Sequence, residues 1–247
     1  MVASAGYDGT VRLWHVKTKK QLARMHGHKA PVLCVAWSPE GTILSGARDA
    51  TVVLWDAATG KAVSTLRGHR GHVTAAASLA CVRRPQLFVT GAQDGTVRLW
   101  DCRAAASVAS LGLHTSQAGS GAVGDIEPLR SASGGGHLFV TAGADKRLCV
   151  VDLRKCESGA VADVDGAPHA LLHELTEHTD FIYSLTSIGP LVLSGSGNGT
   201  LLCHSAVKGR CLWGVGACQT GAVRAIHAGP QALVTASDDG NALAWAM

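Results

Sequence analysis

The sequence predicts an all-β fold made of repeated small sheets, the arrangement of a β-propeller or a solenoid. Of the 247 residues, 30 are Gly, 16% are charged and 4% are aromatic, which favours short strands and turns over long helices. The 47% of hydrophobic residues is enough to bury a large core. Similar segments recur 41 to 53 residues apart, and a period near 40 residues indicates a repeat architecture.

Each repeat is marked by an acidic or amide residue at the third place of a ten-residue segment. The six segments are GYDGTVRLWH, ARDATVVLWD, AQDGTVRLWD, GADKRLCVVD, SGNGTLLCHS and SDDGNALAWA, with anchors Asp8, Asp49, Asp94, Asp145, Asn198 and Asp239. A Ser or Thr stands four residues before every anchor. A Trp stands six residues after the anchor, except where Val151 and His204 replace it. The pattern therefore predicts one structural unit used six times, with residues 1–247 as a single domain.

Turn residues divide a complete repeat into four strands. Across residues 31–67 the strand-like runs are PVLCVAWS, TILSGA, TVVLWD and AVSTLR, with the turns SPEG and AATG between them. The same division predicts four complete units, a first unit that starts at its second strand and a last unit that stops at its third. Gly/Ser/Ala-rich inserts around residues 114–136 and 155–168 explain the wide intervals and are predicted to be loops.

The repeat resembles the WD40 family over essentially the whole chain, including the Gly-His pairs at Gly27-His28 and Gly68-His69. The resemblance implies a β-propeller in which His, Ser/Thr, Asp and Trp form a buried hydrogen-bonded tetrad in each blade. Two tetrads are complete: His28, Ser45, Asp49 and Trp55, and His69, Thr90, Asp94 and Trp100. The fourth set (His114, Thr141, Asp145) and the fifth (His178, Ser194, Asn198, His204) lack the Trp, so we expect these two blades to be looser.

The ends of the chain leave the closure of the ring open. Six blade units are visible, and the first and last are incomplete. In the WD40 family an N-terminal strand usually completes the last blade. One alternative is therefore a fragment of a closed six- or seven-bladed ring. The other is an open ring whose exposed strand edges are covered by another chain.

Several patterns resemble chemical sites but are better explained by structure. GSGAVG at residues 119–124 fits the dinucleotide-binding spacing, yet neither a predicted strand before it nor a helix after it supports such a site. The recurring Ser, His and Asp come with a Trp that a hydrolase does not need. His26 with His28, and His69 with His72, lack a third metal ligand at a familiar spacing. We therefore expect no enzyme activity, no metal or other cofactor and no small-molecule substrate.

The remaining composition indicates an intracellular protein, cytoplasmic or nuclear. The start MVASAGYDGT lacks the layout of a secretion signal, and no apolar run approaches the length of a membrane span. The eight cysteines form no C-x-x-C pair and are expected to be reduced and mostly buried. A net charge of +4 is mild, which makes nucleic-acid binding unlikely.

Binding of a protein or peptide partner is the function that remains, and the sequence does not identify that partner. The turns at the anchors carry residues that differ between repeats, and we expect these to bind a partner: Tyr7, Arg48, Gln93, Lys146 and Asp238. Basic residues also cluster in the turns between third and fourth strands: Lys17, Lys19, Lys20, Arg103, Arg154, Lys155, Lys208 and Arg210. A solvated rim explains them, with an acidic protein and then RNA as alternatives.

One segment adds an alternative function. FVTGAQDGTVRLWDCR ends in W-D-x-R and resembles the box of WD40 substrate receptors of cullin-RING ubiquitin ligases. The resemblance implies that Asp101 and Arg103 contact the ligase adaptor. A second copy keeps Asp152 and Arg154 but has Val151 in place of the Trp. An interaction scaffold is thus the first hypothesis, and a ligase substrate receptor is the second.

Overall fold

The computed structural model describes residues 1–81, 84–115, 121–129, 137–156, 170–215, 219–229 and 231–246. Within these ranges the chain forms 22 strands and one short helix, α1 (Leu153–Cys156), which confirms the predicted all-β class. None of the helical structure in these ranges has the length and apolar character needed to cross a membrane. The insert segments 116–120, 130–136 and 157–169 lie outside the described residues.

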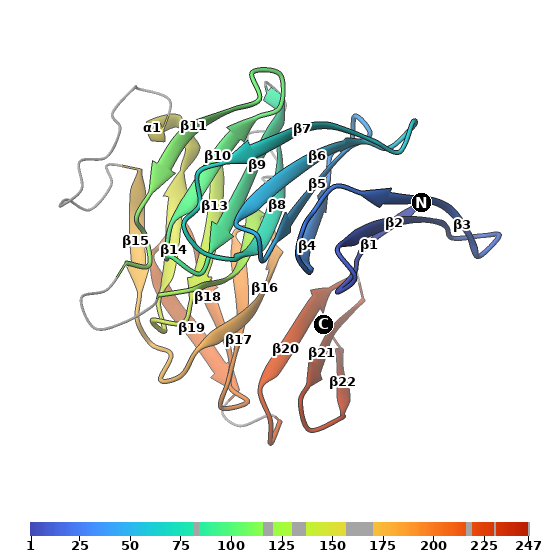
Figure 1. The fold of residues 1–247 in the computed structure, drawn as a ribbon. Helices are drawn as coiled ribbons and strands as arrows, with labels where there is room; N and C mark the ends of the chain where they lie inside the picture. Colours follow the sequence, from blue (N-terminus) through green and yellow to red (C-terminus); the bar gives the residue numbers. More distant parts are fainter. Residues whose placement is uncertain are drawn as a thin grey trace.

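The strands form six antiparallel sheets, here called blades one to six in chain order (Figure 1). Blade one contains β1 (Val2–Ala5), β2 (Thr10–His15) and β3 (Lys20–His26). Blade two contains β4 (Val32–Trp37), β5 (Thr42–Ala47), β6 (Thr51–Asp56) and β7 (Lys61–Arg67). Blade three contains β8 (Val73–Cys81), β9 (Arg84–Ala92), β10 (Val97–Asp101) and β11 (Ala106–Leu111).

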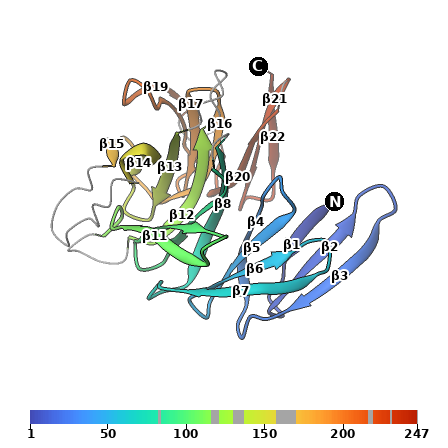
Figure 2. The same ribbon diagram turned by 90° about the horizontal axis from the view of Figure 1, so that it is seen from above.

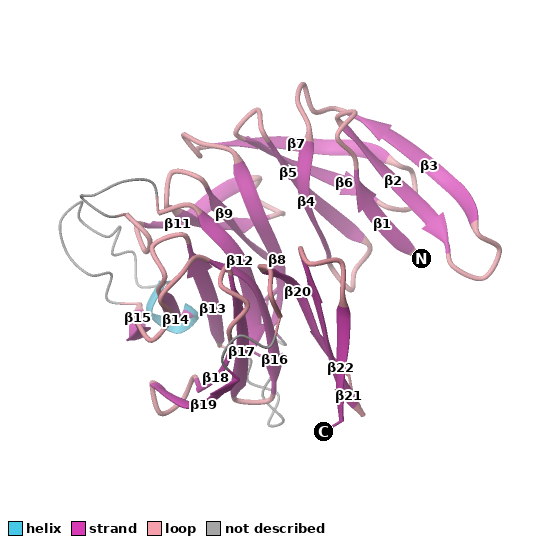
Figure 3. Cartoon of the chain, turned by 90° about the horizontal axis from the view of Figure 1, so that it is seen from below, coloured by secondary structure: helices cyan, strands magenta, loops and turns pink. Residues whose placement is uncertain are grey.

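The second half of the chain repeats this plan. Blade four contains β12 (Val123–Leu129), β13 (Leu138–Gly143), β14 (Leu148–Asp152) and β15 (Leu171–Leu175). Blade five contains β16 (Ile182–Ile188), β17 (Leu191–Ser196), β18 (Leu201–Ser205) and β19 (Arg210–Val215). Blade six contains β20 (Val223–Ala228), β21 (Ala232–Ser237) and β22 (Ala242–Ala246). Blades one and six are three-stranded, as the sequence predicts (Figure 3).

The blades succeed one another around a common centre, which makes the fold a β-propeller. The first strands β4, β8, β12, β16 and β20 contact one another in sequence near the middle, and the last strands lie on the outside (Figure 2). Each hydrophobic cluster is shared by two successive blades. Met25 of blade one, for example, packs in one cluster with Ile43 and Trp55 of blade two. Alternation along each strand therefore builds the core between the sheets.

Polar side chains on the first strands also join neighbouring blades. The first strands of blades two to six share an irregularity after their first residue, and in blades three and five a side chain beside it reaches the next blade. Thr74 Oγ1 donates to the carbonyl of Val123 at 2.6 Å, and Ser184 Oγ donates to that of Val223 at 3.2 Å. These contacts fix the blades relative to one another and thereby fix the surface that their loops form.

Candidate functional site

Two kinds of loop meet at one end of the blades and form a surface that we call the loop face. It comprises the loops between second and third strands (residues 6–9, 48–50, 93–96, 144–147, 197–200 and 238–241) and the loops that lead into each blade (27–31, 68–72, 113–115, 176–181 and 219–222). Backbone bonds join the two kinds: Arg48 N donates to the carbonyl of Pro31 within blade two at 3.0 Å, and Val32 N at the start of blade two donates to that of Gly6 in blade one at 3.1 Å. Residues of neighbouring blades are therefore held side by side on this face.

The anchor residue shapes the loop between the second and third strands. The Asp49 carboxylate accepts the backbone N–H of Thr51 at 3.0 Å and its hydroxyl at 2.5 Å, which closes the turn. The residue after each anchor has a left-handed backbone, with φ of 76° at Gly9 and at Gly95. Ala50 and Lys146 adopt the same conformation, with φ of 60° and 69°, at a steric cost that Gly avoids.

The first complete tetrad lies in blade two. His28 Nε2 lies 2.7 Å from Ser45 Oγ, which also accepts the indole N–H of Trp55 at 2.8 Å. The contact between His28 Nδ1 and Asp49 is longer, at 3.4 Å, and Asp49 also accepts the backbone N–H of Lys29 at 2.9 Å. Burial lowers the pKa of His28, so the ring is neutral near pH 7. Contrary to our expectation, Asp49 is not fully buried, because 15% of its side chain is exposed.

Blade three brings together the second complete set, with one difference. His69 Nε2 and the indole N–H of Trp100 both bond Thr90 Oγ1, each at 2.7 Å. His69 Nδ1 lies 3.8 Å from Asp94, beyond hydrogen-bond distance, and instead contacts Thr96 Oγ1 at 3.1 Å. Because Thr96 Oγ1 donates to Asp94 at 2.6 Å, the hydroxyl connects the histidine to the carboxylate. Burial lowers the pKa of His69 to about 4.

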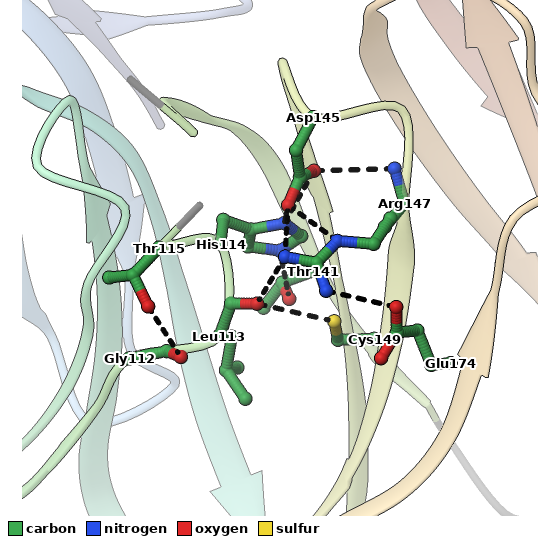
Figure 4. A network of polar contacts seen from close by, with 9 residues as sticks. All are labelled: Gly112, Leu113, His114, Thr115, Thr141, Asp145, Arg147, Cys149 and Glu174. Carbon is green, nitrogen blue, oxygen red and sulfur yellow. Dashed lines mark hydrogen bonds and ion pairs between the residues drawn. The ribbon is translucent and has the colours of Figure 1, made fainter. Parts of the chain in front are cut away.

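Blade four lacks the indole but forms a more extensive ionic network (Figure 4). His114 Nε2 lies 2.8 Å from Thr141 Oγ1, and Nδ1 lies 2.9 Å from the Asp145 carboxylate. Arg147 donates to Asp145 at 2.8 Å and to Glu174 at 2.9 Å. The His–Asp contact is thus shorter here than in blades two and three. The sequence pattern did not indicate the roles of Arg147 and Glu174.

In blade five a second histidine replaces the indole. Ser194 Oγ lies 2.6 Å from His178 Nε2 and 3.1 Å from His204 Nε2. Burial lowers the pKa of both rings, that of His178 to about 4. The Asn198 side chain joins two loops, because its oxygen accepts the backbone N–H of Thr200 at 3.1 Å and its Nδ2 donates to Thr179 Oγ1 at 2.9 Å.

Blade six contains a tetrad position that the sequence pattern missed. Gln219 takes the place of the histidine, is 4% exposed, and donates through Nε2 to the carbonyl of Asn241 at 3.1 Å. The indole N–H of Trp245 reaches Thr235 Oγ1 at 3.4 Å. The spacing gave a usable signal, since Gln219 stands as far before Asp239 as His178 stands before Asn198.

The five expected partner-binding residues all lie on the loop face, but some of them already bond other side chains. Tyr7 is 69% exposed and accepts a hydrogen bond from Arg48, whose guanidinium lies 5.0 Å from the centre of its ring. Gln93 and Lys146 are exposed. Asp238 instead pairs with Arg224 at 2.7 Å.

Arg224 belongs to an aromatic cluster that the sequence did not reveal. Its guanidinium lies 4.1 Å from the centre of the Tyr183 ring, which contacts the exposed ring of Phe181 edge-on.

The opposite end of the blades carries the two W-D-x-R-like turns. Arg103 Nε and Nη2 lie 3.4 and 3.3 Å from the Asp101 carboxylate, and 66% of the Arg103 side chain is exposed. Arg154 pairs with buried Asp152 at 2.6 Å, and 65% of its side chain is exposed. The basic turn residues are exposed on this end: Lys17, Lys19, Lys20, Arg103, Arg154, Lys155, Lys208 and Arg210.

The chemistry of the described residues is that of a structural network. The Ser45 and Thr90 hydroxyls are fully buried beneath their indoles, so a substrate has no access to them as nucleophiles. In the described ranges no three His, Cys, Asp or Glu side chains gather as a metal site. Burial raises the pKa of the Cys34 and Cys149 thiols to about 12, so both remain protonated. Of the GSGAVG segment, residues 119–120 lie outside the described residues, and the strand β12 begins at Val123.

These features define a propeller built from one repeated, internally bonded blade. Residues 1–15, 19–56, 60–101 and 169–205, a little over half of the chain, match the family described as "WD domain, G-beta repeat". The chain belongs to the WD40 family.

Similarity to curated proteins is confined to single repeats. Over 48 residues the chain is 40% identical to guanine nucleotide-binding protein subunit beta-like protein 1 of Mus musculus, covering 19% of the chain and 15% of that protein. Over 45 residues it is 40% identical to Coronin-7 of Bos taurus, covering 18% and 5%. Over 44 residues it is 41% identical to WD40 repeat-containing protein HOS15 of Arabidopsis thaliana, covering 18% and 7%. The matches span only a small part of each relative, and therefore support the repeat alone.

Proposed function

We propose that the protein is a non-enzymatic interaction scaffold whose loop face binds a protein or peptide partner. One observation carries the proposal: the hydrogen-bonded blade is repeated with little change, whereas the residues exposed on its loop face differ from blade to blade. The anchor carboxylates bond their own loops, whereas the residues beside them are exposed: Tyr7, Arg48 and Gln93 directly before their anchors, and Lys146 directly after Asp145. Exposed Tyr and Arg are frequent energetic hot spots of protein interfaces.

Affinity purification with mass spectrometry tests this proposal. We expect the triple variant Tyr7→Ala/Arg48→Glu/Gln93→Ala to lose partners that the wild-type chain retains. A matched control, Lys17→Ala/Lys20→Glu/Lys208→Ala, changes exposed residues at the opposite end and should retain them. If the triple variant kept every partner, the loop face would not be the binding surface.

A ligase substrate receptor is the second candidate. It is favoured by the two turns in which an exposed arginine pairs with the aspartate two residues earlier, at Asp101/Arg103 and Asp152/Arg154. We expect Arg103→Asp to abolish pull-down of a cullin-RING adaptor while circular dichroism shows an intact fold. Arg210→Asp, an exposed arginine outside the W-D-x-R box, is the control. Unchanged pull-down by the Arg103 variant would remove this candidate.

A further inference from the structure

Three exposed cations on the loop face lack an acidic partner among the described residues. Lys29 lies in the loop between blades one and two, Arg48 in a loop of blade two and Arg70 in the loop between blades two and three, and all three are exposed. The ion pairs seen among the described residues involve other cations, among them Arg12, Arg24, Arg103, Arg147, Arg154 and Arg224. The charge of these three groups is therefore available to an external ligand.

The nearby carboxylates accept hydrogen bonds from the backbone of the same loops. Asp49 accepts the backbone N–H of Lys29 at 2.9 Å, and Asp94 accepts that of Arg70 at 2.7 Å. Both carboxylates also bind the Thr two residues later, and only 15% of each side chain is exposed. Each acid thus fixes the backbone that carries a cation, while the cationic side chain remains exposed.

Tyr7 orients the Arg48 side chain. Arg48 donates a hydrogen bond to the Tyr7 hydroxyl, and its guanidinium lies 5.0 Å from the Tyr7 ring centre. A guanidinium that is already ordered loses less conformational entropy on binding, and its planar fork matches a carboxylate. Arg48 is therefore suited to bind a carboxylate at a defined position.

The other side of the same face has the opposite charge. The loops of blades five and six carry Glu177, Asp180, Asp238 and Asp239, and Arg224, a cation beside them, pairs with Asp238. An acidic ligand would be attracted to blades one to three and repelled from blades five and six. This charge separation gives one orientation to a bound acidic segment.

We propose that the loop face of blades one to three binds an acidic peptide segment of the partner protein, through Lys29, Arg48 and Arg70. The proposal rests on the proposed function, since it names the chemistry of the partner at that face. Neither Lys29 nor Arg70 belongs to the anchor pattern, and it is the structure that places both on the loop face that carries Arg48, where their backbones bond Asp49 and Asp94.

Fluorescence anisotropy with a short labelled peptide rich in Asp and Glu tests the proposal. We expect this peptide to bind more tightly than a Lys-rich peptide of equal length, and more weakly as salt increases. Lys29→Glu/Arg70→Glu should weaken its binding by about tenfold or more. Lys17→Glu/Lys208→Glu makes the same charge change at the opposite end and should alter the Kd by less than about twofold.

The possible failures are distinguishable. If both double variants weakened binding equally, or if the acidic peptide bound no better than the Lys-rich one, the acidic-peptide proposal would be wrong. It would fail alone if the Tyr7/Arg48/Gln93 triple variant still lost its copurified partners. If that triple variant kept them all, the proposed function itself would fail.

Discussion

Adding one methyl group at Gly27 tests whether the Gly-His pair exists to make room for the tryptophan of the tetrad. A Cβ at Gly27 would lie 2.8 Å from Trp55 Cη2, whereas carbon atoms in contact prefer about 3.5 to 4.0 Å. Trp55 is 1% exposed and bonded to Ser45, so the ring cannot move away without losing packing or that bond. Overpacking of this kind costs about 1 to 3 kcal/mol. We therefore expect Gly27→Ala to lower the free energy of unfolding by about 2 kcal/mol.

Urea denaturation followed by circular dichroism measures this loss. Gly112→Ala is the matched control, because a Cβ there would lie at an ordinary 3.4 Å from Thr115 and should change stability by less than about 0.5 kcal/mol. Trp55→Phe removes the part of the indole that reaches Gly27, so Gly27→Ala should cost at least about 1 kcal/mol less in that background. An equal cost in both backgrounds would refute the steric explanation.

Three further predictions follow from the tetrads and their loops. The pKa of His178 is lowered from 6.5 to about 4 in the folded chain, so on acidification the unfolded chain takes up a proton at this histidine before the folded chain does. The free energy of unfolding should therefore fall by up to about 3 kcal/mol as the pH decreases from about 7 to 4. The urea midpoint of His178→Gln should depend less steeply on pH, and an identical slope would contradict this prediction. Burial raises the pKa of Asp125 to about 7, which changes stability in the opposite direction but by the same amount in both proteins. Ala50→Gly relieves a φ of 60° and should raise the free energy of unfolding by about 0.5 to 1 kcal/mol, whereas Ala58→Gly, at an exposed turn position without such a φ, should not. Hydrogen exchange should be several-fold faster in β14 and β18, which lack the indole bond, than in β6 and β10, and equal protection would show that Arg147 and His204 replace it fully.

Much of the blade architecture could be predicted because each blade repeats the same local sequence pattern. Alternating apolar residues, turn residues and the spacing from Ser45 to Asp49 and Trp55 all act within one blade, so one chain segment contains the whole signal. The structure accordingly has the six sheets and the three-stranded end blades that the pattern predicts.

What the sequence did not reveal involves residues that meet across loops or blades. Tyr7 and Arg48 stand one repeat apart, but the repeat spacing does not show that their side chains meet, and Arg147 reaches Glu174 across 27 residues, a separation that the repeat does not fix. In blade six Gln219 occupies the histidine position, so a pattern defined by a histidine missed it. Such contacts depend on how the blades are placed side by side, and this placement follows from packing of the complete core.

The exchange of residues at the tetrad also explains why the Gly-His pair is absent from some blades. Where Val151 replaces the indole, Leu113 replaces the glycine, and the two side chains pack in one buried cluster. Where His204 replaces it, Glu177 takes the glycine position, with its carboxylate 3.9 Å from His204 Nδ1. In blade three Gly68 instead makes room for Arg98, whose Nη1 would lie 2.6 Å from a Cβ there. The volume beside the histidine is thus filled in each of these blades by a different pair of residues. A blade that loses its Trp can therefore keep its packing, and variation at these positions need not disturb the loops that would contact a partner.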